Sequence, residues 1–309
     1  MTAADLVPSR DLTALLSSAS VEVSSRGHQL AELRDHFAPG TDVTITFLPG
    51  DNYRHNVETA TALRRAGYNP VPHIAAREMA SREALDDFLA RLRDEADVTR
   101  ILLIAGDTAI ARGPFKSSLD LCASGLLEAR GIARLSVAGH PEGHPYLETV
   151  EALDVLDAWQ AWGHERKIQV EVMTQFCFEA APILGWIGGL DARRIQLPVI
   201  VGLAGPATPA TLMKFALRCG VGHSMRAVRS QIGRFGRLLT DTGPDEVMRG
   251  LQSAPKTATA AIAGFHLFPF GGLRKSGDWL RSYRRESIGL PNRASADSAS
   301  VEPEASRFD

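Results

Sequence analysis

Short apolar runs alternate with longer stretches of helical periodicity along most of the chain. The runs that have the length and composition of buried strands are Ser20–Ser24, Asp42–Phe47, Asn69–Ile74, Arg100–Ile104, Arg134–Val137, Val170–Met173, Leu197–Val201 and Thr259–Leu267. The helical patterns are His28–Phe37, Asn56–Ala66, Ser81–Glu95, Ser117–Ala129, Leu147–His164, Ala180–Leu190, Pro209–Cys219, Met225–Leu239 and Pro244–Leu251. This alternation of β and α units predicts a parallel sheet.

The number of units predicts how that sheet closes. Eight βα units within about 270 residues fit a closed (β/α)8 barrel, the TIM-barrel fold. The rival is an open doubly wound sheet, which normally carries a G-x-G-x-x-G turn after its first strand. Here the first strand leads into Ser24-Ser25-Arg26-Gly27, so we expect the α/β barrel, as a single domain.

Three segments follow from this assignment. Residues 1–17 form an N-terminal extension, and residues 18–285 form the barrel with a C-terminal helix. Trp279 and Tyr283 are four residues apart, so they can dock on the barrel as one helical face. Residues 286–309 are polar and poor in aromatic residues, so we expect a flexible tail.

Charge and cysteine content exclude several classes of protein. The 34 basic and 36 acidic residues give a net charge of −2, which favours neither a nucleic-acid nor a membrane partner. Three widely spaced cysteines form no CxxC pair, so we expect them to be reduced and mostly buried. The N-terminus lacks a signal-peptide pattern, and we expect a cytoplasmic homo-oligomer.

The strand nearest the N-terminus offers a candidate acid. Strand alternation places Glu22 on the face opposite Val21 and Val23. If the valines pack against helices, the carboxyl group points into the barrel. Desolvation there would raise its pKa and make it a proton donor. The alternative is a carboxylate in a structural ion pair.

Polar residues also follow other strands, where a barrel gathers its active site. They include Thr46, His73, the run Ala105-Gly106-Asp107, and His140 and His144 within Gly139–Pro145. The two histidines lack a third partner, so we do not expect a metal site. Thr174 and Gln175 end the run that begins at Val170, beside Phe176. Gln175 either binds a ligand or caps its strand.

Several motifs together resemble those of the methylenetetrahydrofolate reductases over roughly residues 15–280. They are V-E-V at 21–23, P-H-I at 72–74, A-G-D at 105–107, G-P-F-K-S-S-L at 113–119, S-V-A-G-H-P-E-G-H-P at 136–145 and V-M-T-Q-F at 172–176. The resemblance implies a TIM barrel with bound FAD. It also implies reduction of 5,10-methylenetetrahydrofolate to 5-methyltetrahydrofolate by NADH or NADPH.

The resemblance also implies roles for individual residues. Glu22 matches the general acid that protonates N10 of the folate, and Asp107 matches the aspartate beside flavin and pterin. Gln175 and Phe215 match positions that contact folate and nicotinamide. The residues that match flavin-contacting positions are Thr46, His73, Ala105, Gly106, Asp107, Ser118, His140 and His144.

This sequence departs from the family pattern where flavin phosphates would bind. Ala105 stands where the family often has arginine, and His140 stands where it has tyrosine. Leu147–Trp162 is acidic and apolar rather than basic, and the arginine expected near Gly272 is replaced at best by Arg274. We therefore expect weak FAD binding. Two alternatives stay open: a flavin-free reductase that passes hydride directly from NADH to folate, and a non-catalytic folate-binding barrel.

Overall fold

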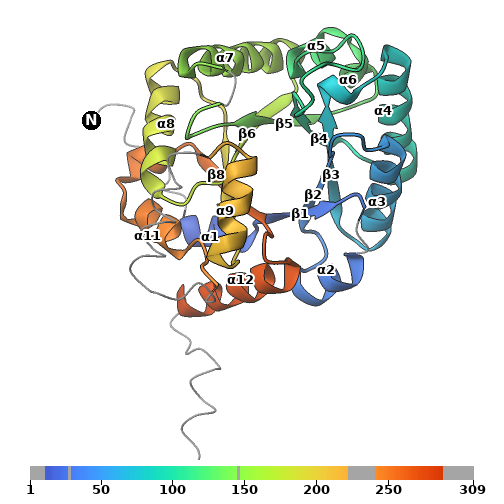
Figure 1. The fold of residues 1–309 in the computed structure, drawn as a ribbon. Coiled ribbons are helices and arrows are strands. Elements are labelled where there is room, and N and C mark those ends of the chain that lie inside the picture. Colours follow the sequence, from blue (N-terminus) through green and yellow to red (C-terminus); the bar gives the residue numbers. More distant parts are fainter. Residues whose placement is uncertain (1–10, 27–28, 145–146, 222–240, 288–309) are drawn as a thin grey trace, which may run out of the picture.

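Eight parallel strands close into a barrel in the order β1 to β8 (Figure 1). This is seen in a computed structural model that describes residues 11–26, 29–144, 147–221 and 241–287. The strands are β1 (Ser20–Ser24), β2 (Asp42–Thr46), β3 (Asn69–Ala75), β4 (Arg100–Ile104), β5 (Arg134–Gly139), β6 (Gln169–Thr174), β7 (Val199–Ala204) and β8 (Ile262–Phe268). The predicted TIM-barrel fold is confirmed.

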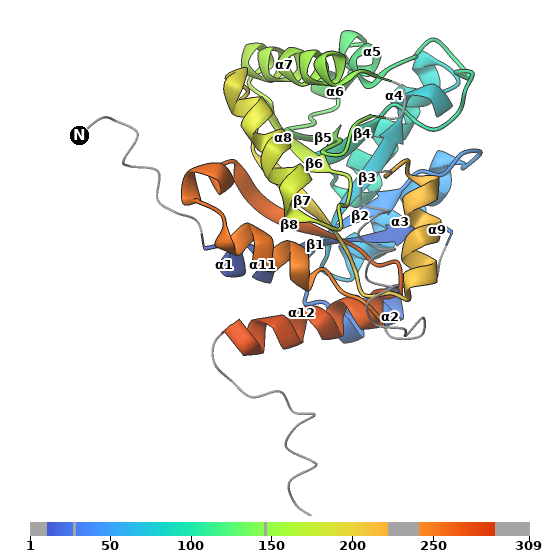
Figure 2. The same cartoon turned by 60° about the vertical axis from the view of Figure 1, so that its left-hand side comes forward.

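Helices surround the strands as an outer ring. They are α1 (Leu12–Ser17), α2 (Leu30–His36), α3 (Tyr53–Arg65), α4 (Arg82–Ala96), α5 (Ser118–Ala123), α6 (Leu126–Ala129), α7 (Thr149–Arg166), α8 (Ala180–Ala192), α9 (Pro209–Arg218), α11 (Asp245–Ser253) and α12 (Leu273–Ser287), with 3₁₀ turns η2 (Ala76–Glu78) and η3 (Lys256–Thr259). Helix α9 stands apart from this ring: it lies in front of the strands in Figure 1 and to their right in the turned view of Figure 2. Helix α11 packs against α8 in its place.

Four boundaries differ from the sequence predictions. The predicted helix Ser117–Ala129 is broken where Gly125 adopts a φ of +69°, which glycine tolerates without strain. The predicted strand Thr259–Leu267 starts only at Ile262, after η3. The predicted extension 1–17 contributes α1, whose Leu16 is fully buried in the core. The tail predicted to begin at 286 starts later, since α12 continues to Ser287.

Two predicted segments fall partly or wholly beyond the described structure. The predicted helix Met225–Leu239 lies outside the described residues, as does the tail from residue 288 onward. The predicted docking of the C-terminal helix is confirmed. The rings of Trp279 and Tyr283 lie 5.3 Å apart and pack against the core.

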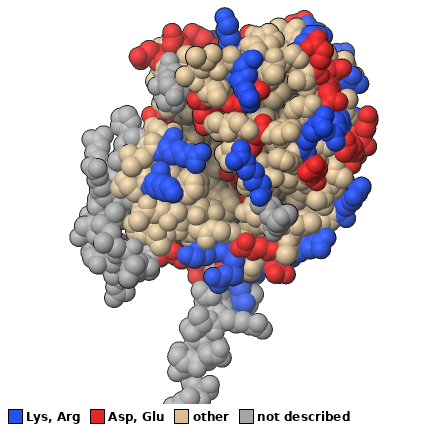
Figure 3. Space-filling model, turned by 45° about the vertical axis from the view of Figure 1, so that its right-hand side comes forward, with Lys and Arg blue, Asp and Glu red and all other residues tan. Residues whose placement is uncertain are grey.

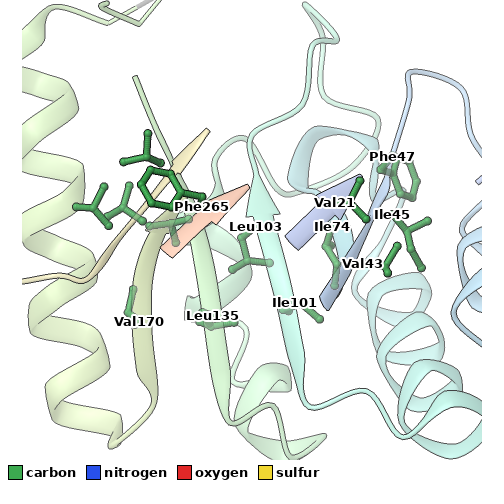
Figure 4. Packing of buried hydrophobic residues seen from close by; sticks show 14 of the residues in the cluster. Val21, Val43, Ile45, Phe47, Ile74, Ile101, Leu103, Leu135, Val170 and Phe265 are labelled. Carbon is green, nitrogen blue, oxygen red and sulfur yellow. The ribbon is translucent and has the colours of Figure 1, made fainter. Parts of the chain in front are cut away.

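The core between strands and helices is built from alternating strand residues. Val21, Val43, Ile45 and Ile74 are fully buried and share one cluster with helix residues such as Leu89. Figure 4 shows the labelled valines and isoleucines of β1, β2 and β3 gathered on neighbouring strands. Their partners at the alternate positions therefore face the barrel interior.

Strand register arranges those interior residues in layers. Because Glu22 pairs with Thr44 and Thr44 with Val71, the stagger of a closed barrel puts Glu22 level with His73, two residues further along β3. The same shift of two residues for every second strand assigns Ala138 of β5 and Gly202 of β7 to this layer. The layer beneath holds Thr44, Leu102, Met173 and His266.

Above the buried Ser136 and Glu171 at the N-terminal end of the barrel, the interior is apolar on one side and polar on the other. Val71, Leu102, Met173 and Ile200 form a separate buried cluster inside the barrel. On the side of β1, β2 and β8 the interior residues are hydroxyl-bearing, acidic or imidazole groups, and they are Ser20, Glu22, Thr44 and His266. The apolar cluster therefore fills one side of the barrel above Ser136 and Glu171, and the side of β1, β2 and β8 is left able to bind polar groups.

The N-terminal end of the barrel is closed by an ion-pair network. Glu171 is 2% exposed and accepts from Arg100, from Arg134 Nε at 3.0 Å, and from Ser136 Oγ at 2.6 Å. Arg100 also pairs with Asp42. A buried carboxylate with this many donors is fully compensated, so the network fixes the starts of four strands.

Among the described helices, none combines the length and the apolar character that crossing a bilayer requires.

Candidate active site

Glu22 and His73 face each other inside the barrel. Glu22 Oε2 lies 3.8 Å from His73 Nε2, and their side chains are 18% and 10% exposed. Burial raises the pKa of Glu22 to about 8 and lowers the pKa of His73 to about 4. At neutral pH the pair is therefore a carboxylic acid beside a neutral imidazole, not an ion pair. The distance also exceeds a hydrogen bond.

Polar atoms without partners surround this pair. Thr44 Oγ1, Thr46 Oγ1, His73 Nε2 and His266 Nε2 are buried and have no hydrogen-bond partner within the described chain. Such groups carry a desolvation cost unless a ligand or water satisfies them. All four belong to inward-facing positions of β2, β3 and β8. Their clustering beside an uncharged acid marks this side of the barrel as a binding site for a polar ligand.

Asp107 lies at the same end of the barrel as Glu22. Burial, and then the negative fields of Asp107 and Glu22, raise the pKa of Cys219 to about 11. The thiol of Cys219 therefore lies within the electrostatic field of both carboxyl groups. Asp107 itself is exposed in the β4–α5 loop. Gly106 before it has a φ of +93°, and a Cβ there would meet Ala75 Cβ at 3.3 Å. Glycine is required for this turn, and the turn presents Asp107 to solvent.

The side-chain oxygen of Gln175 is hydrogen-bonded to the neighbouring backbone, whereas its side-chain nitrogen is not. Its Oε1 accepts a hydrogen bond from Phe176 N at 3.1 Å, while its backbone N–H donates to Gly139 O at 2.8 Å. The side-chain carbonyl oxygen of Gln175 therefore caps the end of the strand, as the capping interpretation predicts. No described residue accepts from its Nε2, and that amide remains able to donate to a ligand.

The two histidines after β5 lie next to each other. The rings of His140 and His144 are 4.5 Å apart and nearly perpendicular. Burial, and secondarily His144, lower the pKa of His140 to about 4, and burial also lowers the pKa of His144. Both are therefore neutral hydrogen-bonding groups. Within the described chain no three histidine, cysteine or carboxylate side chains gather as metal ligands.

Phe215 belongs to an aromatic cluster at the mouth. It stacks on Phe270 at 4.1 Å with an interplanar angle of 18°, and Phe176 meets Phe270 edge to face at 4.8 Å. Both Phe178 and Phe268 pack against the same cluster. One face of Phe215 is thus already occupied, and its partly exposed remainder lies at a wall built from α9, β8 and the end of β6.

Ala105 and the start of α7 do not offer a flavin diphosphate the cations that the family resemblance implies there. Ala105 offers no charge, and α7 begins with a capping box made by Glu148 and Glu151. Phosphate oxygens at this helix start would meet carboxylates rather than arginines or lysines. Ser118 is available at the start of α5 and is partly buried. A hydroxyl group there does not replace the missing cations.

The sequence prediction missed His266 and Thr44. Both are fully buried inside the barrel beneath Glu22. The alternation of β8 carried the signal, because Phe265 and Leu267 flank His266 just as valines flank Glu22. The pKa of His266 falls to about 3 through burial, with further contributions from His73 and Arg100. A hydrogen bond of 2.8 Å joins Ser20 Oγ and Nδ1 of His266.

Comparison with known proteins adds little to this geometry. No family model matches the sequence. One similar solved structure is a type I 3-dehydroquinate dehydratase from Clostridium difficile, crystallised with covalently modified comenic acid. It shares 12% identity at a TM-score of 0.37, over 61% of this chain and 76% of that one. This weak likeness says nothing about the reaction.

Proposed function

We propose that this protein is an enzyme that reduces 5,10-methylenetetrahydrofolate to 5-methyltetrahydrofolate, with NADH or NADPH as the hydride donor. One observation carries the proposal. Glu22 is held as an uncharged acid, with a pKa of about 8, beside a neutral His73 and a set of unpartnered polar atoms. An acid that keeps its proton at neutral pH is what opening of the methylene bridge needs.

The reaction balances with one proton and one hydride. Glu22 donates its proton to N10 as the bond between N10 and the methylene carbon breaks, which leaves an iminium at N5. The nicotinamide then transfers hydride from its C4 to that carbon and becomes NAD(P)⁺. Glu22 regains a proton from solvent, to which 18% of its side chain is exposed.

The surroundings support a role in orientation as well. The Nε2 of Gln175 is free to donate to a pterin or carboxamide oxygen, and an amide can do both. Asp107 shares the mouth with Glu22, where it can accept from the amino group of a pterin. The aromatic cluster around Phe215 and Phe270 offers an apolar wall for a flat ring.

We favour direct hydride transfer over transfer through FAD. The reason is the lack of cations at Ala105 and at the acidic start of α7. The flavin-dependent reaction, which the family resemblance implies, requires other residues to bind the diphosphate of FAD. The visible absorbance spectrum of purified protein separates the two, because bound flavin is yellow.

A steady-state assay tests the proposal. Purified protein should oxidise NADH or NADPH only when methylenetetrahydrofolate is present, and it should form 5-methyltetrahydrofolate in equal amount. The matched control is Glu22→Gln, which should bind folate yet fail to turn over. Folate binding without turnover in the parent protein would instead identify a non-catalytic folate-binding barrel.

A further inference from the structure

A cavity lies at the N-terminal end of the barrel, opposite the end that holds Asp107. Its volume is about 450 Å³, within the range of small-molecule sites. The walls come from the end of α1, the segment from α2 to β2, the starts of β4 and β5, β8 and the last turns of α12. It is thus separated from the mouth by the layers that fill the barrel.

Arginines dominate the charge around this cavity. Arg100, Arg134, Arg281 and Arg284 all line it, whereas Asp42 is the acidic residue in its lining. Ser17, Ser18 and Ser20 also line it, but their hydroxyl groups already bond within the protein, to backbone carbonyl oxygens or to His266. Guanidinium groups form the chemistry that recognises phosphate and carboxylate oxygens.

Three of the four arginines are electrostatically compensated. Arg100 pairs with Asp42 and Glu171, and Arg134 also pairs with Glu171. Arg281 bonds to Asp278 and to His36 at the end of α2. These pairs fix the guanidinium groups in place and cancel most of their charge.

Arg284 is the exception. It forms no hydrogen bond or ion pair with any residue that the structure describes, and its Nε is buried without a partner. Arg100 Nε is likewise buried and unpartnered. These two Nε atoms are themselves buried, so a ligand would meet the other nitrogens of the guanidinium groups. The cavity is thus lined by one arginine, Arg284, whose positive charge no residue of the described chain compensates.

We propose that this cavity binds a small organic anion that carries a phosphate or carboxylate group, with Arg284 as its principal charge partner. The site is independent of the reaction proposed at the opposite end of the barrel. Arg134 offers its exposed edge as a second donor, since its side chain is 42% exposed and only Nε and Nη2 are engaged.

Isothermal titration calorimetry on the full chain tests this site with three probes at constant ionic strength: inorganic phosphate, glycerol 3-phosphate and citrate. At least one should bind saturably. Arg284→Gln should weaken that binding about 10-fold or more, the effect of losing one charge-assisted hydrogen bond. The matched control is Arg285→Gln, which makes the same charge change at a neighbour that does not line the cavity, and it should stay within about twofold of the parent.

A second variant guards against a folding defect. Ala38→Glu places a carboxylate at an exposed lining position and should weaken binding through repulsion. Preference for glycerol 3-phosphate over citrate would identify a phosphate ester, and the reverse would identify a carboxylate. The proposal is overturned if no probe binds the parent protein saturably, or if Arg284→Gln and Ala38→Glu both bind as the parent does.

Discussion

The carboxyl group of Glu22 lies 3.8 Å from the imidazole Nε2 of His73, and burial keeps both groups uncharged at neutral pH. The two side chains belong to one interior layer, whose other members, Ala138 and Gly202, are small. A Cβ on Gly202 would come within 2.3 Å of Thr174 O and 2.7 Å of the Phe268 ring. Only glycine lets β6, β7 and β8 approach so closely beside the acid.

Glu22→Gln should abolish folate reduction while leaving the fold intact. Glutamine has nearly the same shape but cannot supply the proton, so we expect the turnover rate to fall by on the order of 10²–10⁴. Steady-state kinetics with NADH and methylenetetrahydrofolate measure this. Activity within a few-fold of the parent would remove Glu22 from the mechanism.

The rate should also depend on pH in a defined direction. Glu22 has a pKa of about 8, so it is protonated below that pH and loses its proton above it. We expect the turnover rate to be level near neutrality and to decline as pH rises through about 8. A rate that rises across this range would indicate that a deprotonated base limits the reaction instead.

Stability should change with pH through the same residue. The pKa of Glu22 is raised from 4.5 to about 8 in the folded state. Below pH 4.5 the carboxyl group is neutral in both states, so its burial costs no ionisation free energy. As pH rises through this window the unfolded chain loses the proton first, and the folded state is progressively disfavoured. Glu22→Gln should therefore be more stable than the parent at pH 8.5, by on the order of 4–5 kcal/mol, and no more stable at pH 4.5. Urea unfolding at the two pH values checks this.

Glu171→Gln should have the opposite effect on stability. Glu171 bridges Arg100 and Arg134 at the base of the barrel, and its loss leaves two guanidinium groups without their shared anion. We expect a loss of about 3–5 kcal/mol, measured by the same unfolding experiment at pH 7. Equal stability of parent and variant would mean that Asp42 and solvent suffice for the arginines.

Gln175→Glu separates ligand binding from strand capping. The substitution keeps an acceptor for Phe176 N but removes the free Nε2 donor and adds a charge. Folate affinity should fall about 10-fold or more, as for a lost hydrogen bond plus repulsion, while the unfolding midpoint changes little. A variant with reduced stability and unchanged affinities for folate and NADH would support strand capping alone.

Two identical tripeptides show what the sequence can and cannot predict. Val21-Glu22-Val23 and Val170-Glu171-Val172 carry the same alternation, and in both the glutamate faces the barrel interior. Alternation is a local property, so the inward direction of Glu22 and the eight strands were predictable. The environments of the two glutamates are not local. Glu171 meets Arg100 and Arg134 from other strands, whereas Glu22 meets an uncharged histidine.

The parts of the site that were not predicted depend on the same long-range packing. His266 reaches the space beneath Glu22 from the last strand, and the register of β8 against β1 decides that proximity. The stacking of Phe215 on Phe270 from the loop after β8, which occupies one face of the Phe215 ring, was not foreseen either. The cavity at the base of the barrel joins the ends of α1, α2 and α12. No sequence motif marks that meeting point.

The most direct test of the proposed reaction is a single turnover with NADH deuterated at C4, with the protein in excess over methylenetetrahydrofolate. Hydride transfer straight from nicotinamide should place the deuterium on the methyl group of 5-methyltetrahydrofolate without loss to solvent, and the protein should stay colourless. A methyl product that carries solvent hydrogen, made by a yellow protein, would show that flavin carries the hydride. No labelled or unlabelled methyl product, with NADH unconsumed, would contradict the proposed reaction itself.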